Sequence, residues 1–217
     1  MLLTEISKIE PENKLHLKSG TTLTDRKAIE DWIEGAASNT DFDIYFNSDN
    51  TVNIRGSISL SARALYHIPV KFKNIYGTFN CEFNYLKSFE NLPTLVAEQY
   101  WLHGNDLSSF SSLREPITCE SITLNSTHFT SFHNIHKHFK HIGSSFSFSG
   151  GVTNLLGLLM IKNLSEGLII HKSGIYNETK CHQLQDLMDN YIVNKRGDVH
   201  QCQEELLDAG FVKEARF

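Results

Sequence analysis

The chain has 217 residues and a formal net charge of −5, so it offers no strong positive field to attract nucleic acid. Hydrophobic residues make up 40% of the sequence, which is enough for a sizeable core in one elongated domain with caps. The longest apolar run, at 155–161, is too short to span a bilayer, and the N-terminus lacks the pattern of a secretion signal. We therefore expect a soluble, cytoplasmic protein with no membrane partner and with four reduced cysteines outside any CxxC pair: Cys81, Cys119, Cys181 and Cys202.

Residues 1–49 are predicted to form an N-terminal cap of mixed α/β structure. Two segments, LLTEISKI and KLHLKSGTTL, suggest short strands or a hairpin. A helix is expected over 26–38, with Asp25 or Thr24 as its N-cap. Four apolar residues share one face of that helix and indicate the side that packs on the next unit: Ala28, Ile29, Trp32 and Ile33.

A repeat of 21–23 residues runs through 50–172. Its clearest mark is the apolar triplet Leu86, Phe89 and Leu92, spaced three residues apart. The other triplets in phase, the first one incomplete, are Leu65 and Ile68; Leu107, Phe110 and Leu113; Phe129, Phe132 and Ile135; and Val152, Leu155 and Leu158. A strand signal of two apolar residues at alternate positions precedes each triplet: Ile58 and Leu60, Phe79 and Cys81, Tyr100 and Leu102, Ile122 and Leu124, and Phe146 and Phe148.

An asparagine recurs two residues before the triplet, where a turn must tuck in its backbone. Asn84 and Asn105 hold this position, and Thr127 and Gly150 follow at the later equivalents. Asparagine side chains satisfy backbone groups that such a turn leaves unpaired. Because a single unit has too little apolar surface to fold alone, the repeats are expected to stack, with their short strands paired in parallel.

This pattern resembles divergent leucine-rich repeats, most closely the short repeats of tailed-phage proteins. Their units read strand, Cys, Asn-Asn-x-Leu-x-Ser-Leu and Pro, and the resemblance covers 41–172, with further likeness in the segment 50–72 and the tail 202–211. Many positions that are Leu in that family are Phe here. The resemblance implies a mainly β, leucine-rich-repeat-like parallel β-solenoid of about five repeats with α caps. The matching residues are Phe79, Cys81, Asn84, Leu86, Ser88, Phe89, Leu92 and Pro93.

Residues 173–217 are predicted to form a C-terminal helical cap. Asn177 is placed to cap a first helix, Gly197 and Asp198 separate it from a second, and Gly210 is placed to end the second. The alternative is that this helical pair binds a partner or forms a dimer. The apolar faces consist of Cys181, Leu184, Leu187, Met188, Tyr191 and Ile192 in the first helix and Val199, Cys202, Leu206 and Leu207 in the second.

The most tempting candidate for chemistry is a cluster of five histidines: His128, His133, His136, His138 and His141. Close histidines do bind metals, and His133 and His136 are the best candidates here. In the repeat frame, however, the apolar residues between them take the inward positions, so the histidines are expected mainly on the outer side. No carboxylate or cysteine accompanies them closely, and HEXXH is absent. We therefore expect surface histidines, without a metal or other cofactor.

Nucleophile and phosphate-binding motifs are also missing from the sequence. It contains no GxSxG, no P-loop and no GxGxxG, and the cysteines fall at apolar positions. The sequence therefore predicts a protein that is not an enzyme.

The outward positions of the strands form the predicted partner-binding site. When Phe79 points inward, Asn80 points outward, and in the next repeat Trp101 does the same. A large aromatic among small polar groups has the composition of an interface anchor. The alternative is that a cap or loop folds over this tryptophan. The predicted partner-binding residues are Asn80, Glu82, Gln99, Trp101, His103, Thr123 and Asn125.

These observations predict a non-enzymatic protein-interaction module. The resemblance to phage repeats implies a phage-encoded protein that binds a host protein, of a defence system or of the transcription machinery, in the host cytoplasm. One alternative is a His-rich metal-binding protein or enzyme. Another is a nucleic-acid binder, which the net charge opposes; it would use Trp101 together with Lys71, Lys73, Lys137 and Lys140.

Overall fold

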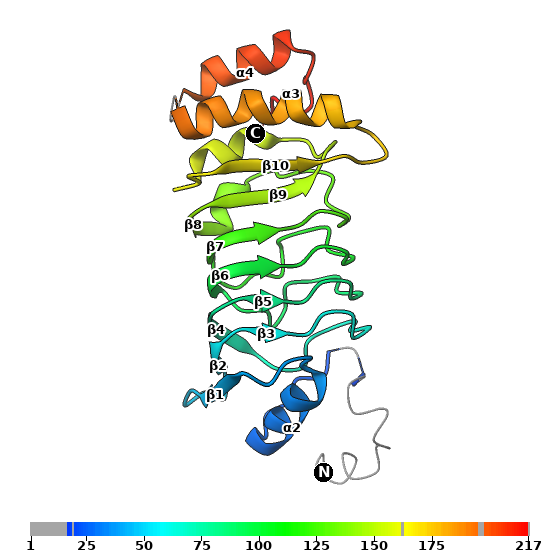
Figure 1. The fold of residues 1–217 in the computed structure, drawn as a ribbon, viewed down its shortest axis with the longest axis vertical. Coiled ribbons are helices and arrows are strands. Elements are labelled where there is room, and N and C mark those ends of the chain that lie inside the picture. Colours follow the sequence, from blue (N-terminus) through cyan, green and yellow to red (C-terminus); the bar gives the residue numbers. More distant parts are fainter. Residues whose placement is uncertain (1–16, 19, 162, 195–197, 217) are drawn as a thin grey trace.

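The structure is a computed structural model that describes residues 17–18, 20–161, 163–194 and 198–216. A parallel β-solenoid of about five turns occupies residues 52–171, with helices over its C-terminal end (Figure 1). This confirms the predicted mainly β solenoid with a helical cap. The strands predicted in LLTEISKI and at the start of KLHLKSGTTL lie outside the described residues.

One sheet runs the length of the solenoid in the order β1-β2-β4-β6-β7-β9-β10. The first pair is antiparallel, and all later pairs are parallel. Off this path, β3 pairs with β5, β5 with β6, and β8 with β7. The strands are β1 (Phe42–Phe46), β2 (Val52–Gly56), β3 (Ile58–Ser59), β4 (Phe72–Tyr76), β5 (Phe79–Asn80), β6 (Leu95–Trp101), β7 (Ile117–Thr123), β8 (Phe139–Ile142), β9 (Ser145–Ser149) and β10 (Gly167–His171).

Helices close the two ends, and short helical turns lie in the later repeats (Figure 1). The α-helices are α2 (Arg26–Ala36), α3 (Glu178–Asp189) and α4 (Val199–Asp208). The shorter segments are the 3-10 turns η2 (Ile135–Lys137) and η3 (Leu155–Met160) and the π-helical turn η4 (Asn190–Asn194).

The apolar residues of the predicted strand signals lie where the sequence placed them, but the strands of the sheet extend beyond these signals. All ten apolar residues of these signals are buried. The sequence did not predict β2, β4, β8 or the first halves of β6 and β7. In that part of the ladder the register shifts between Val52 and Asn53 and again after Ile117, which breaks the two-residue period. Gly77 packs against the backbone of Gly56 at the bend, since a Cβ on Gly77 would lie 2.6 Å from the Gly56 carbonyl carbon.

The asparagine turn behaves as predicted. Asn84 is buried, and its Oδ1 accepts hydrogen bonds from the backbone N–H groups of Arg63 and Leu65, both at 3.0 Å. One repeat later, Asn105 Oδ1 accepts from Leu86 N at 3.1 Å. Each asparagine therefore joins its own turn to the preceding repeat. Four of the five triplets are fully buried, and only Leu113 is half-buried.

The helices at the two ends of the solenoid are capped by residues that the sequence predicted. The carboxylate of Asp25 accepts from Ala28 N at the start of α2, and Asn177 Oδ1 accepts from Lys180 N at the start of α3. Gly210 ends the α4 segment with φ +82°. The buried face of α2 consists of Ile29, Trp32, Ile33 and Ala36, whereas Ala28, predicted on this face, is half-buried.

Candidate functional site

The predicted partner-binding residues lie in regular rows across the strands. Asn80 in β5 pairs in register with Trp101 in β6, which pairs with Thr123 in β7. The row continues to Ser59 on one side and to Ser147 on the other. Gln99 lies one row earlier, opposite Ser121, while Glu82, His103 and Asn125 come two residues after the central row. We call this surface the strand face.

Trp101 is half-buried in its row. It is therefore less exposed than the sequence predicted, although no cap or loop covers it completely. The neighbours on either side, Asn80 and Thr123, are also half-buried. A half-buried tryptophan has less rotamer freedom to lose than an exposed one when a partner covers it.

An ion pair lies beside Trp101 on the strand face. The Nδ1 atom of His103 lies 2.6 Å from Oε1 of Glu82, and both side chains are mostly buried, with exposed fractions of 21% and 14%. The backbone N–H of Glu82 donates to Asn80 Oδ1 at 3.1 Å. Burial raises the pKa of Glu82, while the charge of His103 and the bond to Asn80 oppose that rise. The two side chains form a mostly buried polar contact that a partner of matching polarity can recognise.

Phe83, next to this ion pair, has a strained backbone that the sequence reasoning missed. It has φ +53° and its side chain is 58% exposed, with the ring edge-to-face against His103 at 4.6 Å between centroids. A left-handed conformation costs a residue with a Cβ about 1–2 kcal/mol. The turn itself requires it, because Ala62, Gly104 and Ser126 hold the equivalent positions with positive φ. The sequence indicates this conformation through Gly104, which stands 21 residues after Phe83 at the equivalent position of the next repeat, because glycine adopts a positive φ readily.

Two exposed tyrosines stack on each other in the turns of successive repeats. The rings of Tyr66 and Tyr85 stack with centroids 5.0 Å apart, and the side chains are 63% and 46% exposed. Tyr85 N donates to Leu65 O, which joins the two turns. We call Tyr66, Phe83 and Tyr85 the aromatic rim. Exposed aromatics gathered on one surface are typical of protein interfaces.

At the C-terminal end of the strand face, Ser147 Oγ lies 2.8 Å from His171 Nε2. Burial lowers the pKa of His171, and the charge of His103 lowers it further. A neutral imidazole beside a hydroxyl is one half of a nucleophile–base arrangement. Ser147, however, is only 5% exposed. The pair therefore holds β9 and β10 together and does not present a nucleophile.

The histidine cluster is dispersed over different contacts. His128 Nε2 lies 3.3 Å from Asp106 Oδ1, His141 Nδ1 lies 3.0 Å from Asn163 Nδ2, and His138 stacks on the ring of Phe110. Of the two metal candidates, His136 lies in η2 and is half-buried, while His133 precedes η2 and is exposed. Within the described part of the chain, no three His, Cys, Asp or Glu side chains are grouped so that they could hold a metal ion.

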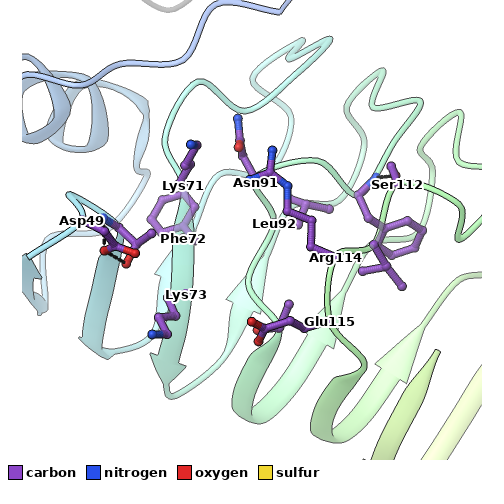
Figure 2. Close-up of a pocket in the computed structure, with 13 residues that line it drawn as sticks. Asp49, Lys71, Phe72, Lys73, Asn91, Leu92, Ser112, Arg114 and Glu115 are labelled. Atoms are coloured by element: carbon purple, nitrogen blue, oxygen red, sulfur yellow. Dashed lines mark hydrogen bonds between the residues drawn. The ribbon is translucent and has the colours of Figure 1, made fainter. Parts of the chain in front are cut away.

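A groove of about 220 Å³ lies away from the strand face, along the segments that lead into β4, β6 and β7 (Figure 2). Its charged residues are of both signs, three basic and two acidic: Lys71, Lys73, Arg114, Asp49 and Glu115. In Figure 2, the side chains of Lys71 and Lys73 extend away from each other. We call it the return groove.

Charged residues of the return groove lie near groups of opposite sign. Hydrogen bonds from Thr51 lower the pKa of Asp49, so this carboxylate stays ionised near Lys73. Arg114 lies 3.9 Å from Glu90, and both side chains are mostly exposed. Two of the four lysines proposed for nucleic-acid binding lie here, while Lys137 and Lys140 lie on η2 and β8. The lysines therefore do not form a single basic surface.

None of the described helices is long and apolar enough to cross a membrane. No family model matches the chain, and no curated protein or solved structure shows significant similarity to it. The functional argument therefore depends on the surface itself.

Proposed function

We propose that this protein is a non-enzymatic protein-interaction module that binds its partner through the strand face and the aromatic rim. The observation that carries the proposal is the combination of the half-buried Trp101 at the end of β6 with the Glu82–His103 ion pair and the exposed Phe83 in the turns that follow β5 and β6. Large aromatics surrounded by fixed polar groups make up the energetic centre of many interfaces.

The area of this surface suits a folded protein better than a small molecule. The three rows and the rim extend over at least three repeats, and neighbouring strands in a sheet are about 4.8 Å apart. A small ligand normally needs a concave site, whereas the strand face is a surface of paired strands. Tyr66 of the aromatic rim does line a cavity of about 420 Å³, but beside His67 and Ser88 and outside the strand rows.

For the class of partner, we propose a host-cell protein, of a defence system or of the transcription machinery. Its support is the resemblance of the repeat sequence to that of tailed-phage proteins, and the proposed binding surface does not depend on it.

Capture of partners by the full chain from host-cell lysate, followed by mass spectrometry, tests the proposal. Trp101→Ala is expected to abolish capture while leaving the thermal unfolding transition unchanged within about 1 kcal/mol, as expected for a half-buried surface side chain. Arg114→Ala, in the return groove, is the matched control and should capture normally. Capture that survives changes at Trp101, Asn80, His103 and Thr123 would exclude the strand face as the interface.

A further inference from the structure

The two edge strands of the sheet, β1 and β10, differ in what covers their outer backbone groups. At the C-terminal edge, side chains of α3 occupy the backbone donors of β10: Asp189 Oδ1 accepts from Leu168 N at 2.7 Å, and Gln185 Oε1 accepts from Ile170 N at 3.0 Å. This is a common way to prevent another strand from adding to an edge. At the N-terminal edge, β1 is the last strand of the sheet, and Figure 1 shows α2 lying beside it.

The hairpin geometry shows which backbone groups of β1 face outward. Asn47 N donates to Thr51 O at 2.9 Å where the hairpin closes, and Val52 N donates to Lys71 O on the far side of β2. Because hydrogen-bonded pairs alternate in an antiparallel ladder, Asp43 and Tyr45 direct their backbone groups toward β2. The backbone groups of the residues between and beside them, including Ile44, therefore point away from the sheet.

No backbone group of the described residues pairs with this outer edge of β1. The strand, FDIYF, has high β-propensity and contains neither the lysine nor the proline that commonly protects an edge. Its register with β2 is regular from Phe42 to Phe46. The edge is therefore straight enough to accept another strand.

A cleft of about 420 Å³ lies between α2 and this edge. The apolar part of its lining is Phe42 and Ile44, and all of its charged lining residues are acidic: Glu30, Glu34 and Asp43. Two basic side chains lie close to the strand. Arg26 lies over the ring of Phe46 at 5.2 Å, and Arg55 faces Asp43 across the register. On α2, Lys27 lies 4.0 Å from Glu30 and 2.9 Å from Asp31, so part of the acidic charge is compensated. Among the described residues no ion pair involves Glu34, and the cleft lining keeps a net negative charge.

We propose that the outer edge of β1 binds an extended segment of another protein that carries lysine or arginine at alternate positions. The segment would add to the sheet as a further strand, with its backbone on the outward groups of Ile44 and Phe46. Its basic side chains would enter the acidic cleft beside α2, and charge complementarity is the reason for choosing a basic segment. This surface is distinct from the strand face, so the inference does not depend on the proposed function.

The experiment measures backbone amide exchange by NMR on the full chain. The probe is a short synthetic peptide of alternating valine and lysine, and the matched control peptide alternates valine and glutamate. We expect the amides of Ile44 and Phe46 to exchange rapidly in the free chain. The lysine peptide should slow them about tenfold or more, as new hydrogen bonds do, and the glutamate peptide should not.

Two sets of variants test the edge and the charge separately. Ile44→Pro removes an outward N–H without removing a bond to β2 and should abolish peptide binding. Glu30→Gln combined with Glu34→Gln should weaken binding of the lysine peptide several-fold without changing the circular dichroism spectrum. Glu204→Gln combined with Asp208→Asn on the exposed side of α4 is the charge control and should bind normally.

Three results would overturn the proposal. Equal binding of both peptides would remove the charge argument. Protection of Ile44 and Phe46 in a free monomeric chain would show that the chain covers its own edge. Protection that appears together with dimers in analytical ultracentrifugation would assign the edge to a second copy of the chain.

Discussion

The strand face and the return groove run along the same repeats, yet they differ in how their polar groups are held. On the strand face, Glu82 and His103 are mostly buried and in direct contact. At the return groove, Arg114 of its lining and the neighbouring Glu90 are mostly exposed and 3.9 Å apart. Exposed pairs of this kind contribute little energy and lose it in salt, whereas partly desolvated pairs discriminate between partners. This contrast is why we place the function on the strand face.

The largest expected effect concerns the turns that support the strand face. Asn105→Ala removes the acceptor of Leu86 N and the donor to Cys81 O and Leu102 O, all buried. Each unsatisfied buried group costs about 1–3 kcal/mol, so the free energy of unfolding should fall by about 3 kcal/mol or more. Urea denaturation measures this.

The matched change beside the return groove is Ser112→Ala. Ser112 Oγ accepts a single hydrogen bond, from Phe89 N at 2.8 Å, in a partly buried position. Its loss should cost about 1 kcal/mol. Equal losses of unfolding free energy in Asn105→Ala and Ser112→Ala would contradict the proposed difference between the turns of the strand face and the return groove.

A smaller effect, of opposite sign for stability and binding, is expected at Phe83. Phe83→Gly relieves the positive φ and should raise the free energy of unfolding by about 0.5–1 kcal/mol. The same change removes an exposed ring of the aromatic rim and should weaken partner capture. Ala62→Gly, at the equivalent turn position with φ +54°, is the control that should stabilise without affecting capture. A Phe83→Gly variant that is less stable than the wild type would mean that the ring supports the fold.

Replacing His171 should change how the free energy of unfolding depends on pH. Its pKa is lowered in the folded state by burial, so the unfolded chain binds the proton more readily. The contribution of His171 to stability is therefore fully present above its ordinary pKa of about 6.5 and is lost as the pH falls through the lower folded pKa. His171→Gln should reduce the loss of stability between about pH 7 and 5, measured by urea denaturation at each pH. His67 and His138, whose pKa values burial also lowers, contribute equally to both proteins.

The smallest effect is expected in the return groove. Lys73→Ala and Arg114→Ala should each change the free energy of unfolding by less than about 0.5 kcal/mol, because both side chains are exposed. Neither should affect partner capture. Loss of capture in either variant, with an unchanged unfolding transition, would move the interface to the groove.

The sequence predicted the parts of the fold that depend on short-range pattern. Phe79 and Cys81 alternate, and Asn84 recurs at Asn105, so the strand, the turn and the inward phase could be derived. The strands β2 and β4 could not, because a bulge after Val52 breaks their period. The same alternation of inward and outward residues predicted the rows of the strand face, and Asn80, Trp101 and Thr123 do lie next to one another in register.

The burial and the neighbours of individual side chains could not be predicted from the sequence. The partial burial of Trp101 depends on neighbours from adjacent strands, and the exposed ring of Phe83 depends on a backbone conformation that phenylalanine rarely adopts. The open edge of β1 depends on which backbone groups the hairpin directs outward.

The most direct test of the proposed interface compares partner capture by three full-length proteins under identical conditions: wild type, Trp101→Ala and Arg114→Ala. We predict that Trp101→Ala weakens binding of the captured partner about thirtyfold or more, as for a central interface tryptophan, while Arg114→Ala binds as the wild type does. Equal binding by wild type and Trp101→Ala, with all three proteins folded, would contradict the assignment of the interface to the strand face.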